Sequence, residues 1–130
     1  MLLFKEKFLE KIKSGEKSQT IRLWKYRKMR AGQRSFIAGV GYIRIESVER
    51  VELDQLTDDD ATLDGFPTAD ALREEIRSLY DADILARRRP YIIRFTVYPP
   101  SMQQAIAAEQ EKKRSDKKNK RQLFQHFGFQ

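Results

Sequence analysis

Hydrophobic and polar positions follow two different rhythms along this chain, and the change between them marks the first expected elements. Phe8, Leu9 and Ile12 recur at the spacing of one helix face, up to a glycine-containing helix end at 14–15. From 18 to 26 side chains alternate between two faces, as they do in a strand. The pattern therefore predicts a helix that leads directly into a strand.

The same rhythms predict the remaining elements. Short strands are expected at 2–4, 34–38 and 91–98, and the alternating stretch 42–53 has room for two more. Thr68 is suited to cap a helix over 69–80, and 58–65 reads as an acidic loop. This order of elements is typical of an α+β domain built on a small mixed or closed sheet.

A sharp change of composition divides the chain near residue 100. We expect a compact domain over 1–100 and a basic C-terminal helix or tail over 101–130, which ends in Phe124, Phe127 and Phe129. Such a tail either stays disordered until it meets a partner or docks as a helix. It would dock on its own domain or on a second copy, giving a homodimer through the tail.

Composition excludes several functional classes. The chain of 130 residues has no cysteine and a single histidine, His126, so disulfides, thiolate chemistry and histidine metal sites are excluded. The consecutive acids 58–60 lack the spacing of a ligand set, so we predict no metal and no cofactor. The apolar start is broken at once by Lys5, Glu6 and Lys7. We expect a soluble, cytoplasmic protein without a membrane partner.

Charge is unevenly distributed in this basic chain of net charge +7. Residues 22–34 carry six cations and no acid, residues 46–83 carry thirteen acids against three arginines, and residues 112–121 are again strongly basic. A basic face attracts polyanions through phosphate contacts and counterion release. The pattern predicts a nucleic-acid partner, although a merely solvated basic surface would have the same composition.

The octapeptide Gly15–Arg22 gathers the residues with the most chemical potential. Lys17 lies close to other cations, which together with burial would lower the pKa of its amine toward a useful range. Thr20, beside Lys17, would be the nucleophile. Arg22, on the same strand face as Thr20, can bind phosphate or an oxyanion. Each residue also has an ordinary interpretation: Gly15 as a helix cap, Lys17 as a loop cation, Thr20 as a strand residue, and Arg22 as an ion-pair partner of Asp64.

Aromatic residues lie among these cations. Trp24 and Tyr26 share the predicted strand face of Thr20 and Arg22, where they could stack a base. They could equally be core residues that close one end of the sheet. The predicted binding set around the octapeptide is Gly15, Glu16, Arg22, Trp24, Lys25, Tyr26 and Arg27.

The spacing Gly15-x-Lys17-x4-Arg22 resembles the GxKxxxxR signature of ASCH domains. The order of elements around it, over about residues 2–99, agrees with that family. The resemblance implies a small PUA-like β-barrel with two or three flanking helices, and binding of RNA or a modified nucleoside. The basic tail lies outside the family pattern.

The resemblance also implies candidate chemistry. One branch of the family consists of N4-acetylcytidine amidohydrolases, whose lysine, threonine and loop carboxylate correspond here to Lys17, Thr20 and Asp64. The lysine would act as base, the threonine would attack the acetyl carbonyl, and the acid would help protonate the departing amine. We therefore expect an RNA-binding ASCH-type domain, with the amidohydrolase or a ribonuclease as the enzymatic alternatives.

Overall fold

The computed structural model describes the backbone of residues 1–126 and the side chains of residues 1–123. The chain forms two compact units, one over Met1–Val97 and one that begins at Tyr98. The phenylalanines expected to form an aromatic end, at 124, 127 and 129, lie outside the described side chains.

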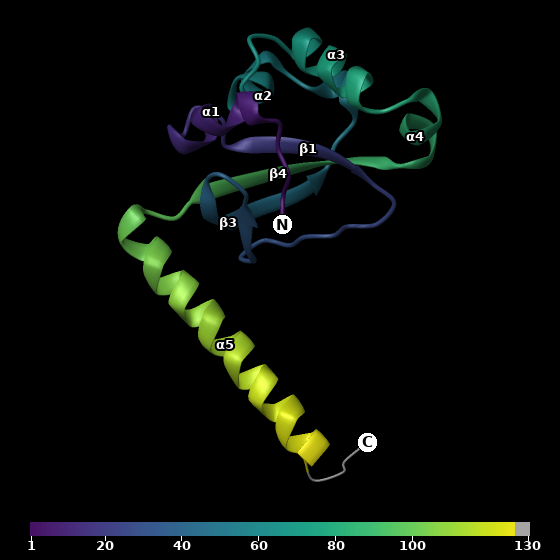
Figure 1. The fold of residues 1–130 in the computed structure, drawn as a ribbon. Coiled ribbons are helices and arrows are strands. Elements are labelled where there is room, and N and C mark those ends of the chain that lie inside the picture. Colours follow the sequence, from purple (N-terminus) through teal and green to yellow (C-terminus); the bar gives the residue numbers. More distant parts are fainter. Residues whose placement is uncertain (127–130) are drawn as a thin grey trace. The chain divides into compact units, whose positions relative to one another are not determined.

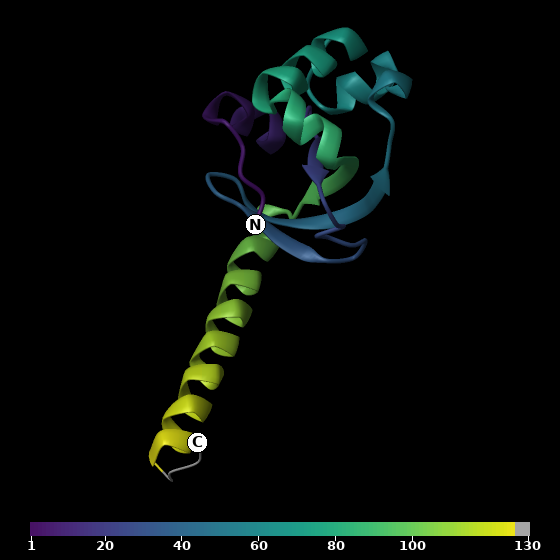
Figure 2. The ribbon, with the colours of Figure 1, turned by 90° about the vertical axis from the view of Figure 1, so that its right-hand side faces the viewer.

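The first unit is a curved antiparallel sheet covered by short helices (Figures 1 and 2). Four strands pair in the order β1-β4-β3-β2, so that β1 and β2 form the two edges. Its elements, in chain order, are η1 (Glu6–Phe8), α1 (Leu9–Lys13), β1 (Gln19–Trp24), β2 (Arg34–Ile37), β3 (Gly41–Arg50), η2 (Leu53–Gln55), α2 (Asp58–Leu63), α3 (Ala69–Leu79), α4 (Ala82–Arg87) and β4 (Arg89–Val97).

Side-chain alternation along β4 divides the core into two clusters. Tyr91, Ile93 and Phe95 face one side, where they pack with residues of β2 and β3 and with Ile12 of α1. Ile92 faces the other side and packs with Ile21 of β1 and with α2 and α3. Because side chains alternate with a period of two, the two faces of β4 belong to different core clusters.

The predicted closed barrel is wrong, because this four-stranded sheet leaves β1 and β2 as open edges. The stretch expected to hold two strands forms one long strand, β3, with a register shift between Ile45 and Ser47. The expected N-terminal strand contributes a single bridge, from Leu2 to Ile37. Too few strands remain to close the sheet.

The first unit has four α-helices among its described residues, where two or three flanking helices were expected. The additional helix α2 occupies the expected acidic loop. Thr57 and Asp60 form a capping box at its start, in which each side chain accepts a hydrogen bond from the other residue's backbone N–H. The predicted cap of α3 is confirmed, because the Thr68 hydroxyl accepts from the Ala71 N–H at 3.1 Å.

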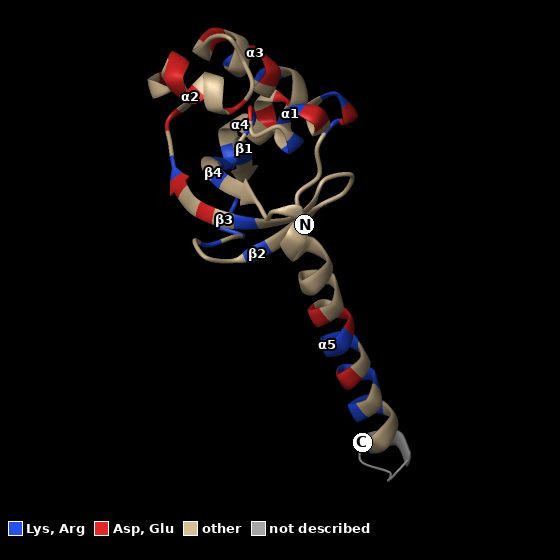
Figure 3. Cartoon of the chain, turned by 90° about the vertical axis from the view of Figure 1, so that its left-hand side faces the viewer, with Lys and Arg blue, Asp and Glu red and all other residues tan. Residues whose placement is uncertain are grey.

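The second unit is dominated by α5 (Pro100–His126), a single helix that continues through the basic stretch. In Figure 3, lysines and arginines alternate with a few acids along this helix, and further acids lie on α2 and α3. No helix in residues 1–126 is both long enough and apolar enough to span a bilayer.

Candidate functional site

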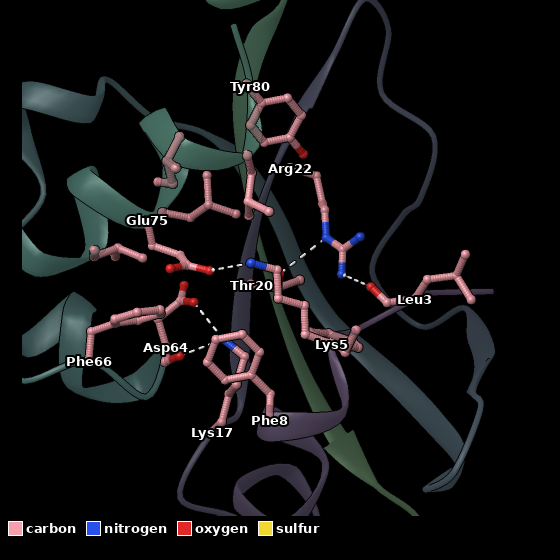
Figure 4. Close-up of a pocket in the computed structure, with 15 residues that line it drawn as sticks. Leu3, Lys5, Phe8, Lys17, Thr20, Arg22, Asp64, Phe66, Glu75 and Tyr80 are labelled. Atoms are coloured by element: carbon pink, nitrogen blue, oxygen red, sulfur yellow. Dashed lines mark hydrogen bonds and ion pairs between the residues drawn. The ribbon is translucent and has the colours of Figure 1, made fainter.

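A pocket of about 260 Å³ lies beside β1 in the first unit (Figure 4). Because β1 is an edge strand, residues from both of its faces reach this pocket: Thr20 and Arg22 from one face, Ile21 from the other. The pocket is lined by Leu3, Phe4, Lys5, Phe8, Lys17, Thr20, Ile21, Arg22, Asp64, Phe66, Leu72, Glu75, Ile76, Leu79 and Tyr80.

Lys17 reaches the pocket because the chain reverses sharply after α1. Gly15 adopts a φ of 83°, a left-handed conformation that side chains other than glycine rarely tolerate. The Lys17 N–H then donates to the Lys11 carbonyl at 2.9 Å. The turn directs the Lys17 side chain inward, where it is only 3 % exposed.

Asp64 comes to the same place from the C-terminal end of α2. It is the C-cap residue of that helix, and the preceding Leu63 carbonyl accepts from the Ser18 N–H at 2.9 Å. This bond fixes the end of α2 against the start of β1. Asp64 is 3 % exposed, so its carboxyl group is held inside the protein rather than in a solvated loop.

The Lys17 amine and the Asp64 carboxylate form a buried ion pair. Nζ lies 2.6 Å from Oδ1 and also donates to the Asp64 backbone carbonyl. Burial lowers the pKa of Lys17, and the attraction of Asp64 opposes that shift only in part. Burial likewise raises the pKa of Asp64 against the effect of Lys17. The two pKa values move toward each other, which lowers the free energy needed to transfer a proton between the two groups.

Gln19 supports this pair from behind and was not among the predicted site residues. Its Nε2 donates to Asp64 Oδ2 and to the Asp60 carbonyl, both at 3.0 Å, and its Oε1 accepts from Arg94 Nε at 3.2 Å. Arg94 in turn lies 3.4 Å from the Asp60 carboxylate. The side chain of Gln19 is fully buried. A polar residue on the apolar face of an amphipathic strand was the available signal.

Thr20 and Arg22 are adjacent on the pocket side of β1, as the strand alternation predicts. Arg22 Nε donates to Thr20 Oγ1 at 3.1 Å, and Nη2 donates to the Leu3 carbonyl at 2.7 Å. Thr20 is 6 % exposed. Because the guanidinium supplies a donor to Oγ1, the threonine retains its own proton for another acceptor.

Aromatic side chains form much of the remaining wall. The Lys17 amine lies 5.0 Å from the centroid of the Phe8 ring, 5.7 Å from that of Phe66 and 5.8 Å from that of Phe4. Arg22 also lies over Phe4, at 4.8 Å. These rings exclude water from the cations and offer flat surfaces to a planar ligand. The N-terminal segment and the residue after the 64–65 turn supply them, and none was predicted as a site residue.

The structure separates the other predicted binding residues from this pocket. Trp24 is buried in the first core cluster, with its ring 5.4 Å from that of Tyr91, so it cannot stack an external base. Glu16, Lys25 and Tyr26 are exposed and do not line the pocket.

Gly15 and Arg27 also lie outside the pocket lining. Gly15 acts through the turn that it permits, and Arg27 donates to the Val48 carbonyl at 2.8 Å. The strand alternation expected to continue to residue 26 stops because β1 ends at Trp24.

Metal ligands are not gathered at this site or elsewhere in the described residues. Across that part of the chain, no three His, Asp or Glu side chains cluster in a way that could hold an ion. The Asp64 carboxylate is paired with the Lys17 amine.

Comparison with known proteins identifies the fold. No protein-family model matches the chain, and no curated protein matches it. Among solved structures, it is similar to hypothetical protein PH0355, with 17% identity and a TM-score of 0.64 over 74% of this chain and 95% of that one.

Two further structures agree. An ASCH domain from Lactobacillus crispatus JV V101 has 18% identity and a TM-score of 0.58 over 68% of this chain and 69% of that one. Protein EF3133 from Enterococcus faecalis V583 has 18% identity and a TM-score of 0.55 over 70% and 69%. At these identities the likeness concerns the fold, and the chain has an ASCH-like fold.

Proposed function

We propose that the pocket beside β1 binds a modified nucleobase and hydrolyses an amide on it, with N4-acetylcytidine as the reference substrate. The observation that carries this proposal is the meeting of Lys17, Thr20 and Asp64 in one pocket, although 47 residues separate the lysine from the aspartate. An amine, an alcohol and a carboxyl group are the set that acyl transfer requires.

The proposed reaction begins with Lys17 in its neutral form. Its Nζ takes the proton of Thr20 Oγ1 as the oxygen attacks the carbonyl carbon of the amide. The carbon–nitrogen bond then breaks, and the exocyclic nitrogen of the base leaves with a proton supplied by Lys17, helped by Asp64. Water hydrolyses the acetyl-threonine ester, which releases acetate and restores Thr20. Burial lowers the pKa of Lys17, which favours the neutral amine that this step requires.

The surroundings of the three residues suit a nucleobase. The rings of Phe4, Phe8 and Phe66 provide flat apolar surfaces, and a pocket of about 260 Å³ is the size of a small ligand rather than a polymer. Arg22, which lies beside Thr20 Oγ1, would stabilise the oxyanion formed by attack.

Incubation of the full chain with N4-acetylcytidine, followed by mass spectrometry, tests this function. We expect release of cytidine and acetate, reduced at least about 100-fold by Lys17→Ala and by Thr20→Ala. Thr20→Ser should retain activity, and trapped enzyme should carry acetyl on the peptide containing Thr20. Thr62→Ala is the matched control, because Thr62 is exposed and outside the pocket. Cytidine release that persists in Thr20→Ala would exclude the mechanism.

RNA binding is a second candidate, favoured by the exposed cations just after β1. Lys25, Lys28 and Arg30 are all exposed and none is part of an ion pair described in the structure. They would contact phosphates rather than bases. Lys25→Gln, Lys28→Gln and Arg30→Gln together should weaken binding of a labelled RNA and lower its salt dependence, while N4-acetylcytidine hydrolysis stays unchanged. An RNA affinity that is equal in this variant and the parent would remove the candidate.

A further inference from the structure

The helix α5 carries a continuous stripe of positive charge. With about 100° of rotation per residue, six cations fall within a sector of about 160° that contains no acid. The six, here called the α5 stripe, are Lys113, Arg114, Lys117, Lys118, Lys120 and Arg121. With the same rotation per residue, the acids of this part of the helix lie outside the sector: Glu109, Glu111 and Asp116. Figure 3 shows the lysines and arginines of this helix in blue.

Residues of the α5 stripe are exposed and weakly neutralised. The side chains of Lys113 and Arg114 are 67% and 71% exposed. Their acidic partners, Glu109 and Glu111, are each 4.0 Å away, which is a long separation for an ion pair in water. Within residues 113–121, three pairs at the i,i+4 spacing carry like charges, namely Lys113/Lys117, Arg114/Lys118 and Lys117/Arg121, against the one opposite pair Asp116/Lys120. Like-charge pairs at this spacing disfavour the helix when no counter-charge is bound.

The opposite side of α5 argues against a membrane partner. A helix that lies on a membrane needs bulky apolar residues opposite its cations. Between residues 107 and 122 the only apolar residues are Ala107 and Ala108, and the rest of the side opposite the stripe is polar or charged, with Lys112 among its residues. The segment 107–122 has the charge to approach an anionic surface but carries no bulky apolar side chain that would enter it.

We propose that the α5 stripe binds the phosphate backbone of a nucleic-acid duplex without reading its sequence. The stripe extends over about 12 Å at 1.5 Å per residue. A duplex presents about seven phosphate charges in that length, comparable with the six cations. Binding places anions between cations that otherwise repel, so it also stabilises the helix. The stripe shares no residue with the pocket or with the exposed cations at 25–30, and the proposal does not depend on either.

The test measures binding of the full chain to a labelled 20-base-pair duplex of mixed sequence by fluorescence anisotropy over a range of salt concentrations. We expect a slope of log affinity against log salt near −5 for six phosphate contacts. Replacement of the six stripe cations by Gln should abolish most of that slope. Two duplexes of unrelated sequence should bind equally.

A matched control separates the stripe from net charge alone. Six exposed cations of the first unit are changed to Gln, which lowers the formal net charge from +7 by the same six charges: Lys7, Lys13, Arg44, Arg50, Arg77 and Arg87. This control should keep most of the affinity and slope, and Lys17→Met should bind the duplex like the parent. Equal losses in the stripe variant and the control would overturn the proposal, whatever the outcome of the amidohydrolase assay.

Two further measurements test the proposal. Circular dichroism at 222 nm, after subtraction of the duplex spectrum, should show more helix on binding, and the stripe variant should show no such gain. Anionic phospholipid vesicles should bind more weakly than the duplex at the same salt. Binding to vesicles without binding to the duplex would replace the nucleic acid by a membrane surface and refute the proposal.

Discussion

Two lysines of this chain, one in the pocket and one on α5, show what burial does to a charge. The Lys17 side chain is 3% exposed and lies 2.6 Å from a carboxylate oxygen, whereas the Lys113 side chain is 67% exposed and lies 4.0 Å from its carboxylate partner. Burial lowers the pKa of Lys17 and makes its protonation depend on Asp64. Solvent screens Lys113, so its charge acts chiefly together with its neighbours.

The difference separates two uses of positive charge. In the pocket, a single amine is tuned by desolvation and by a fixed partner, which suits proton transfer at one atom. On α5, six solvated cations act by number and spacing, which suits a polyanion. Substitutions in the pocket should therefore change stability and chemistry, whereas substitutions on α5 should change long-range binding and little else.

The largest effect is expected for Asp64→Ala. It leaves the Lys17 amine and the Gln19 amide without their buried acceptor, so the free energy of unfolding should fall by about 3–5 kcal/mol. Urea denaturation followed by circular dichroism measures the change. Asp83→Ala is the matched control, because its ion pair with Arg87 is exposed and should contribute less than about 1 kcal/mol. Equal losses in the two variants would remove the distinction between buried and exposed pairs.

A smaller loss is expected for Gln19→Met. It keeps the side-chain volume but removes one donor to Asp64 and the acceptor of Arg94, so unfolding should require about 1–3 kcal/mol less. The Asp64 carboxyl would also lose its fixed orientation, which should reduce N4-acetylcytidine hydrolysis more than substrate binding. A lower kcat with an unchanged KM supports this positioning role, and an unchanged kcat in a folded variant contradicts it.

The pH dependence of stability should distinguish Lys17 from the surface lysines. Its pKa in the folded protein is lowered from 10.5, so the unfolded chain holds more protons above that lowered pKa and up to about 10.5. The free energy of unfolding contributed by Lys17 must rise with pH in this window, by at most about 1.4 kcal/mol per pH unit. Urea denaturation from pH 7 to pH 10 should show the rise relative to Lys17→Met. Parallel curves for parent and variant would mean that the pKa of Lys17 is not lowered.

The same linkage has the opposite sign for Asp64. Because its pKa is raised above 3.8, the folded protein holds the extra proton, and its contribution to stability falls as pH rises from about 3.8 through the raised value. Comparison of the parent with Asp64→Asn between pH 3.5 and pH 7 isolates this contribution. A contribution that increases over the same range would contradict the direction of the shift.

The smallest effect on stability is expected for Lys113→Gln and Lys117→Gln together on α5. Both side chains are exposed, so the free energy of unfolding of the first unit should change by less than about 0.5 kcal/mol. Duplex affinity should fall, with the salt slope reduced by about two. A large loss of stability in this variant would show that the stripe has a structural rather than a binding role.

Local patterns in the sequence accounted for much of the secondary structure. The helix end at Gly15, the alternation of β1 and the cap at Thr68 all depend on residues within a few positions of each other. The capping box of α2 is equally local, and the Thr57-x-x-Asp60 spacing would have indicated it. The prediction of a closed barrel was wrong because sheet closure depends on how many strands pair, and no local pattern contains that information.

In the candidate site, too, some residues follow from local sequence patterns and others only from long-range contacts. Lys17, Thr20 and Arg22 are close in sequence, so the strand alternation and the resemblance of their spacing to the ASCH signature were enough to single them out. Trp24 follows the same alternation but is buried against Tyr91, because the strand runs from the open pocket into the core. Gln19 stands out in the sequence only as a polar residue on an apolar strand face, and its contacts with Asp64 and Arg94 reveal what it does.

The sequence by itself determined the turn that directs Lys17 inward, the neighbourhood of Thr20 and Arg22, and the row of cations on α5, because helix and strand periods fix which nearby side chains share a face. Tertiary structure alone decided that Asp64 reaches Lys17 and that three phenylalanines surround them. Those contacts join segments as far apart as Lys17 and Phe66, and packing of α2 and the N-terminal segment against β1 brings them together.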